Sequence, residues 1–134
     1  MEDRRITPVK AAVWNVSTEL HFNNLGSGSG YVNENGGFIV AADTIDNILN
    51  YKEADFIKMD IEGAEYYALL GASSTIEKYM PTLMISVYHK QDDFVRIPML
   101  IKSLNSRYRL YFRHYRKLSV QETVCYALPY KRGK

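Results

Sequence analysis

From residue 55 to residue 129 the sequence alternates between short segments typical of strands and longer segments typical of helices. Runs that are apolar throughout or at every second residue predict strands, and apolar residues repeated along one helical face predict helices. The predicted order is strand, helix, strand, helix, strand, strand, at residues 55–60, 64–79, 82–89, 93–105, 107–115 and 122–129. This order predicts an α/β fold with a mostly parallel sheet, closed at one edge by an antiparallel hairpin.

Residues 1–54 have a different pattern, because short apolar segments there are separated by runs rich in glycine, asparagine and serine. The elements they predict are strands at 11–15, 19–23 and 37–42, a loop at 25–37 and a short helix at 44–51. A length of 134 residues suits one domain. We therefore expect a single domain, 1–134, composed of a β-rich lead-in (1–54), an α/β segment (55–129) and a basic tail (130–134).

The composition is that of an ordinary globular protein, since 46% hydrophobic and 24% charged residues argue against disorder. Cys125 is the only cysteine, so there is no disulfide framework, and its mid-strand position predicts a buried small side chain. No apolar run approaches the roughly 18 residues that a membrane span needs. The N-terminus also lacks the apolar stretch of a secretory signal. We expect a cytoplasmic protein with no membrane partner.

Charge is distributed unevenly, because the first 67 residues sum to −6 and the remaining 67 to +8. A basic half can attract an anionic ligand, and the alternating cationic and aromatic residues at 107–116 leave open a glycan- or nucleotide-binding domain. The other interpretation is that the two halves attract each other within one domain. That interpretation favours a protein without a nucleic-acid partner.

Three carboxylates, on Asp60, Glu62 and Glu65, cluster where the strand at 55–60 gives way to the helix at 64–79. Carboxylates near a helix N-terminus stabilise its dipole, so capping is one interpretation. The other is a carboxylate set that orients a hydroxyl or amine substrate, because ligands of open α/β sheets bind beyond the carboxyl ends of the strands. Asp60, at the last strand position, is the hardest of the three to explain as a cap.

His89 ends the neighbouring predicted strand, where the near-neutral pKa of histidine suits general-base catalysis, although a structural role is the alternative. His114 lies between Arg113 and Tyr115, and strand alternation places it on the face opposite Arg113. Histidines and carboxylates also bind metals. No HxxxH or HxH spacing is present, however, and the sequence predicts no metal site.

The glycine- and serine-rich run at 26–30 (GSGSG) has the composition of a nucleotide-binding loop. Such a loop needs a buried strand before it and a helix directly after it. The residues that follow (YVNENGG) do not predict a helix, so we expect a connecting loop instead.

Residues 56–65 (FIKMDIEGAE) and 68–72 (ALLGA) closely resemble the strand-to-helix turn and the following helix of FkbM-type methyltransferases, whose patterns are IKxDxEGxE and LxGA. Other segments are also similar to one branch of that family: PTL at 81–83, VYHK at 87–90, IP at 97–98, YFRHY at 111–115 and ETV at 122–124. Residues 11–15, 20–22 and 44–46 fit the part that precedes the family's turn. The resemblance therefore covers nearly the whole chain.

The resemblance implies an S-adenosylmethionine-dependent methyltransferase with a Rossmann-like sheet and the cofactor at the carboxyl ends of the strands. Such enzymes typically methylate an oxygen of a sugar or another natural product, so the implied partner is a small-molecule or glycan acceptor. By position, Asp60, Ile61 and Glu62 would lie beside the cofactor, with Asp60 and Glu62 also catalytic. His89 would take the proton from the attacking hydroxyl. The candidate substrate-binding residues are Glu65, Arg113 and His114.

Family members carry, further upstream, a first strand with an acidic glycine-rich turn that holds the cofactor and a second strand whose acid binds the ribose. This chain resembles the family only from a point after both. We therefore expect the C-terminal portion of a methyltransferase, with a partial Rossmann-like sheet that lacks the first cofactor-binding strands. Such a sheet has an unpaired edge, which a second copy or a partner chain could cover. A non-catalytic half-Rossmann module for binding or assembly is the alternative function.

Overall fold

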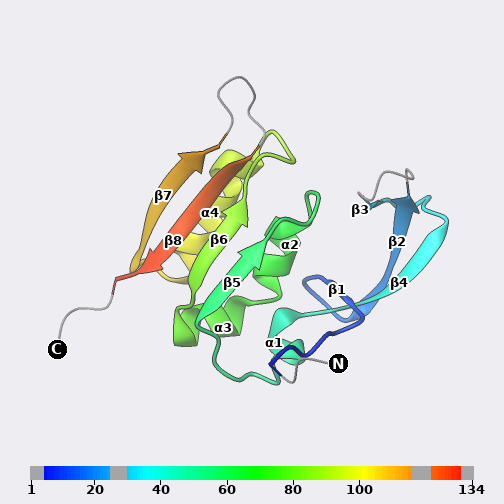
Figure 1. The fold of residues 1–134 in the computed structure, drawn as a ribbon, viewed down its shortest axis with the longest axis horizontal. Helices are drawn as coiled ribbons and strands as arrows, with labels where there is room; N and C mark the ends of the chain where they lie inside the picture. Colours follow the sequence, from blue (N-terminus) through cyan, green and yellow to red (C-terminus); the bar gives the residue numbers. More distant parts are fainter. Residues whose placement is uncertain (1–4, 25–29, 116–121, 131–134) are drawn as a thin grey trace.

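The computed structural model describes residues 5–24, 30–115 and 122–130, which form two four-stranded sheets and four helices (Figure 1). Residues 25–29 of the loop predicted at 25–37 and residues 131–134 of the basic tail predicted at 130–134 lie outside these ranges. In chain order the elements are β1 (Ala12–Val13), β2 (Thr18–Asn24), β3 (Gly30–Val32), β4 (Phe38–Asp43), α1 (Ile45–Ile48), β5 (Phe56–Met59), α2 (Glu65–Leu70), α3 (Ser73–Tyr79), β6 (Thr82–Ser86), α4 (Asp93–Leu104), β7 (Tyr108–His114) and β8 (Thr123–Pro129).

The first sheet is formed by the lead-in and has the strand order β1-β4-β2-β3. β1 pairs with β4 in parallel, whereas β2 is antiparallel to both β4 and β3. Strand β3 falls inside the loop predicted at 25–37, so that prediction is wrong for Gly30–Val32. The segment is a strand because it pairs with β2, Val32 lying opposite Phe22, and pairing with a preceding strand is not encoded in local composition.

The second sheet has the strand order β5-β6-β8-β7 and is mixed rather than mostly parallel. β5 and β6 pair in parallel, and the predicted hairpin of the last two strands is present as β7 and β8. The sheet is not mostly parallel because β8 lies between β6 and β7 and is antiparallel to both. Hydrophobic periodicity identifies strands but does not fix the order in which they pair.

The core lies between the second sheet and α2, α3 and α4, which Figure 1 shows against one face of that sheet. Leu83 and Ile85 of β6, together with Cys125 and Ala127 of β8, are fully buried there. Cys125 is therefore the buried small side chain that the sequence predicts. Its burial raises the pKa of the thiol to about 12.

The single helix predicted at 64–79 is in fact two helices, α2 and α3, separated at Gly71. Gly71 lies so close to the lead-in that a Cβ there would be 2.0 Å from the backbone oxygen of Trp14. Asp46 of α1 caps α3, since its carboxylate accepts hydrogen bonds from the backbone N–H (2.9 Å) and the hydroxyl (2.6 Å) of Thr75. The break therefore depends on contacts with a distant segment, which helical periodicity does not reveal.

An aromatic contact also joins the lead-in to α2. The ring of Trp14 stacks on that of Tyr67, with 4.3 Å between centroids and 24° between planes. On Tyr67 the ammonium of Lys90 lies 5.7 Å from the ring centroid. Tyr67 thus links the lead-in to the loop that follows β6.

Helix α4 confirms the helix predicted at 93–105 and includes Pro98 within its length. Ile97 and Ile101, which are fully buried, pack this helix into the core. In the ranges that the structure describes, no helix is both long enough and apolar enough to cross a membrane.

Candidate active site

The turn after β5 brings Asp60 and Glu62 to the carboxyl end of the second sheet. Glu62 and Gly63 both have positive φ, 56° and 92°, and a non-glycine residue in this region marks a turn held by its surroundings. A Cβ on Gly63 would lie 3.1 Å from Cε of Lys90 and 3.6 Å from Cβ of His89. Glycine therefore permits both the backbone conformation and the close approach of the loop after β6.

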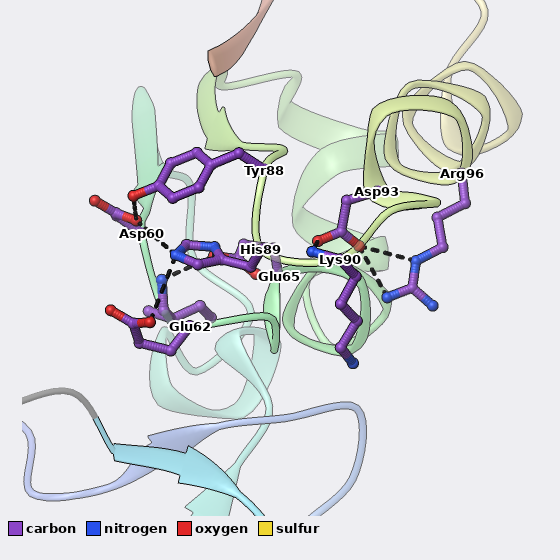
Figure 2. Close-up of polar contacts among 9 residues, drawn as sticks. Asp60, Glu62, Glu65, Tyr88, His89, Lys90, Asp93 and Arg96 are labelled. Carbon is purple, nitrogen blue, oxygen red and sulfur yellow. Dashed lines mark hydrogen bonds and ion pairs between the residues drawn. The ribbon is translucent and has the colours of Figure 1, made fainter. Parts of the chain in front are cut away.

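Glu65 opens α2 and points inward, with none of its surface exposed. Its Oε1 accepts a 2.9 Å hydrogen bond from the backbone N–H of Ile61 and lies 2.9 Å from Nδ1 of His89 (Figure 2). Burial opposes ionisation, but the contacts with His89 and Ile61 outweigh it and lower the pKa of Glu65. This burial does not support the predicted substrate contact, because a carboxylate already held by His89 has no surface to offer a ligand.

His89 lies in the loop after β6, three residues beyond Ser86, rather than at the end of a strand as predicted. Its Nε2 lies 3.4 Å from Oδ1 of Asp60 and 3.7 Å from Oε2 of Glu62, and its side chain is 9% exposed. Burial lowers the pKa of His89, but the carboxylates of Glu65, Glu62 and Asp60 outweigh that effect and raise the pKa above its ordinary value. The imidazole is thus held between carboxylates at both nitrogens.

Tyr88 also contacts Asp60, and the sequence did not predict this contact. The Tyr88 hydroxyl donates a 3.1 Å hydrogen bond to Oδ1 of Asp60, and its ring lies 4.2 Å from that of His89. Burial and the nearby Asp60 carboxylate raise the pKa of Tyr88 to about 12, so the phenol keeps its proton. Tyr88 directly precedes His89 in the sequence, and this position could have indicated that Tyr88 belongs to the site.

A second buried ion pair fixes the loop that carries His89. Asp93 is fully buried, and its Oδ2 accepts a 3.0 Å hydrogen bond from the backbone N–H of Lys90. Its Oδ1 accepts from Nε of Arg96 at 3.0 Å, and Arg96 also lies 4.6 Å from the ring centroid of Tyr66. Asp93 is the first residue of α4, where a carboxylate commonly caps the helix, so the local sequence does not reveal this ion pair.

Among the cavities that adjoin this cluster, two of similar volume are the largest described. One, of about 370 Å³, lies between the lead-in and the turn after β5, and Phe22, Asp60 and Glu62 are among its lining residues. The other, of about 360 Å³, is lined by the loop after β6, including His89, and by Phe94. Asp60 thus borders the first cavity and His89 borders the second.

The structure brings together four of the predicted site residues and separates two others from them. Asp60, Glu62 and Glu65 each contact His89, and Ile61 contributes its backbone N–H to Glu65. His114 and Arg113 lie instead at the end of β7, the outermost strand. There Nδ1 of His114 lies 2.9 Å from the hydroxyl oxygen of Thr123, and Arg113 lies over the ring of Tyr115. Thr123 in turn lines the cavity beside His89.

An α/β fold with carboxylates and a histidine at the carboxyl ends of adjacent parallel strands has the site geometry of an open α/β ligand-binding protein or enzyme. The family model of the methyltransferase FkbM domain matches residues 5–110. The chain belongs to the FkbM methyltransferase family.

A solved structure agrees with this family assignment. The chain is similar to the crystal structure of methyltransferase FkbM from Methylobacillus flagellatus KT, with 28% identity and a TM-score of 0.72. The match covers 92% of this chain but 28% of the other, so the chain spans about a quarter of its neighbour's length. No curated protein sequence gives a match. Family membership implies a methyl donor of the S-adenosylmethionine type.

Proposed function

We propose that this chain is an S-adenosylmethionine-dependent O-methyltransferase that acts on a hydroxyl of a sugar or another natural product. The observation that carries the proposal is His89, held by buried Glu65 at one nitrogen while the other nitrogen faces Asp60 and Glu62. Methyl transfer to a hydroxyl needs a group that orients the acceptor and receives its proton, and this cluster offers both.

The residues beside the larger cavity suit the proposed cofactor. Asp60 and Glu62 expose about half of their side chains (47% and 46%) and line a space of about 370 Å³ next to Ile61. Carboxylates favour a nearby positive charge, which suits the ammonium and sulfonium groups of S-adenosylmethionine. When bound, the cofactor would supply a methyl group on positively charged sulfur that an oxygen lone pair can attack.

His89 is the proposed proton acceptor. Its Nδ1 faces Glu65, which holds the imidazole and favours a proton on that nitrogen. Nε2 is then the nitrogen that can receive the acceptor hydroxyl proton. The carboxylate of Asp60 and the hydroxyl of Tyr88, hydrogen-bonded to each other beside Nε2, would orient that hydroxyl.

The second cavity is the proposed place for the rest of the acceptor. It extends from His89 to Thr123, which contacts His114 at the outer edge of the sheet. An acceptor larger than a single sugar ring would reach His114 along this path, which keeps its proposed role in substrate binding. Arg113 lies on the other face of β7, over the ring of Tyr115, and would contact the acceptor only beyond this cavity. A small-molecule or glycan acceptor fits this arrangement.

The experiment is a transfer assay with the purified chain, methyl-labelled S-adenosylmethionine and a panel of sugars, glycans and hydroxylated natural products. We expect His89→Ala and Asp60→Asn to lower transfer at least about 100-fold, the range of a lost general base. His21→Ala, in the lead-in, is the matched control and should retain activity. No transfer by the wild-type chain, together with no rise in its melting temperature with S-adenosylhomocysteine, would overturn the proposal.

A second candidate function is a non-catalytic binding or assembly module. In the described parts of the chain β5 pairs only with β6, and Phe56 on this strand is 54% exposed. An unpaired strand edge can add a strand from a second copy or a partner chain. A dimer seen by light scattering that dissociates on the Phe56→Glu change would favour this candidate, and a monomer at all concentrations would contradict self-association.

A further inference from the structure

The second sheet has helices on one face only. Figure 1 shows α2, α3 and α4 against that face and leaves the opposite face open. Ile85 and Cys125 point toward the helices, and the residues that alternate with them along each strand point away. The strand register assigns six cationic or aromatic residues to this open face: Phe56, Lys58, Arg109, Tyr111, Arg113 and Tyr126.

Two tyrosines lie side by side on the open face. Tyr126 of β8 is directly opposite Tyr111 of β7 in the strand register, which places their Cβ atoms about 4.5–5.5 Å apart. Tyr111 exposes 50% of its surface, although it lies within a strand of the sheet. Exposed aromatic rings serve as platforms for single-stranded nucleic acids, because every base has a flat face that can stack on them.

Two arginines flank this pair of rings. Arg109 and Arg113 lie two residues before and two residues after Tyr111, so the three side chains share one face of β7. The guanidinium carbon of Arg109 is 4.1 Å from the ring centroid of Tyr130. Among the described residues, neither arginine forms an ion pair with a carboxylate. Unpaired cations on an open surface favour a negatively charged ligand.

A small cavity at one end of the open face offers neutral polar contacts. It measures about 180 Å³ and is lined by Ser86, together with the carboxylates of Asp60 and Glu122, which repel phosphates. Ser86 is only 4% exposed, and neither its hydroxyl nor that of Tyr111 has a hydrogen-bond partner among the described residues. A ribose 2′-hydroxyl can donate to such groups or accept from them, and deoxyribose lacks it. These hydroxyls therefore favour RNA over DNA.

We propose that the open face of the second sheet binds single-stranded RNA. Two bases stack on Tyr111 and Tyr126. Arg109 and Arg113 hold the phosphates beside them, along β7 and away from Asp60. A four-stranded sheet whose surface aromatics stack two or three bases is a common mode of binding single-stranded RNA.

This occupant fits the face better than a second copy of the chain does, because two such faces would bring their unpaired cations together. RNA binding does not depend on methyl transfer. It also differs from the expectation, based on the charge distribution, of a protein without a nucleic-acid partner.

The test is fluorescence anisotropy with a labelled oligouridine of about 10 nucleotides, which is within the site sizes of single-strand-binding folds. We expect saturable binding at low salt that weakens as the salt concentration rises. An oligodeoxyuridine of the same length, which differs only in the 2′-hydroxyl groups, should bind more weakly. An RNA duplex should also bind more weakly, because its bases are already stacked on one another.

Tyr111→Thr removes one ring but keeps a residue that favours strands, so it should weaken RNA binding about 5- to 150-fold, the loss of one base stack. Tyr111→Phe keeps the ring without the hydroxyl, and it should bind the oligodeoxyuridine as the wild type does. Phe38→Thr is the matched control, because it removes a ring that is 59% exposed on β4 of the other sheet. It should bind RNA as the wild type does.

Arg109→Gln should lower the slope of log Kd against log salt concentration by about 0.7, the value for one phosphate contact with a single strand. Lys78→Gln, on α3, should leave that slope unchanged. The proposal is overturned if the wild type shows no saturable binding at low salt, if a folded Tyr111→Thr variant binds as tightly, or if the oligodeoxyuridine binds as tightly as the oligouridine. A dimer that Tyr111→Thr dissociates and that RNA does not disrupt would also overturn it, because a second copy would then cover this face.

Discussion

The backbone N–H of Lys90 donates a 3.0 Å hydrogen bond to Asp93, so the residue beside His89 is tied to the first turn of α4. This bond holds the loop after β6 against the helix, and Arg96 holds Asp93 from the other side. The position of His89 therefore depends on a charged pair that does not itself reach the site.

Asp93→Asn should lower the free energy of unfolding by about 1.5–3 kcal/mol, the usual range for hydrogen bonds to charged groups. Asp93 is fully buried, so the loss of its charge leaves Arg96 without its main partner. Urea denaturation measures the change. Asp92→Asn is the matched control, since Asp92 is exposed and should change stability by less than about 0.5 kcal/mol. Equal effects of the two variants would contradict the prediction.

Asp46→Ala should destabilise the protein by about 2 kcal/mol, at the upper end of the range for lost helix caps. The Asp46 carboxylate is buried and accepts hydrogen bonds from Ser74 and Thr75 at the start of α3. Thermal and urea unfolding measure the loss. Asp55→Ala, on an exposed residue, is the control and should remain within about 0.5 kcal/mol of the wild type.

Gly71→Ala should destabilise the chain by about 3 kcal/mol, because the added methyl group has no space and overpacking is costly. It would meet the backbone oxygen of Trp14 at 2.0 Å, and backbone cannot move aside as a flexible side chain can. Gly37→Ala tests the specificity of this effect. Nothing lies within 4 Å of a Cβ at Gly37, so that variant should unfold at nearly the wild-type urea concentration.

The stability of the protein should depend on pH through His89 and Glu65. The raised pKa of His89 means that the folded state binds its proton more tightly, so this contribution is complete below about 6.5 and is lost as pH rises through the folded-state value. The lowered pKa of Glu65 acts in the opposite direction, and its contribution is lost as pH falls below about 4.5.

Urea midpoints measured between pH 4 and pH 9 test this dependence. The wild type should lose stability above pH 6.5 more steeply than His89→Gln, which has no imidazole to titrate. Parallel curves for the two proteins above pH 6.5 would show that His89 gains no stability from its carboxylate partners.

The sequence predicted the elements from residue 55 onward because their hydrophobic periods are distinct. The strand before Asp60, the helix that begins at Asp93 and the final hairpin follow from local pattern alone. Strand β3 and the break at Gly71 do not, since each depends on a partner segment far away in the sequence. Tertiary contacts decide such elements, and a single sequence does not display them.

The sequence predicted which residues belong to the candidate site better than it predicted how their side chains are arranged. Asp60, Glu62 and His89 stood out because polar residues follow apolar strands at the ligand-binding end of the sheet. The inward orientation of Glu65 was not predicted, because an acidic residue at a helix start is usually an exposed cap. The role of Asp93 was missed for the same reason.

Because Trp14 stacks on Tyr67, its fluorescence is an intrinsic probe of the contact between the lead-in and α2. Trp14 is the only tryptophan, so its fluorescence reports on one place, the junction between the lead-in and α2. Far-ultraviolet circular dichroism instead averages over the helices and strands of the whole chain. If the junction opens before the second sheet melts, the fluorescence will change at a lower temperature than the dichroism. A shared midpoint would mean that both sheets unfold as one cooperative unit.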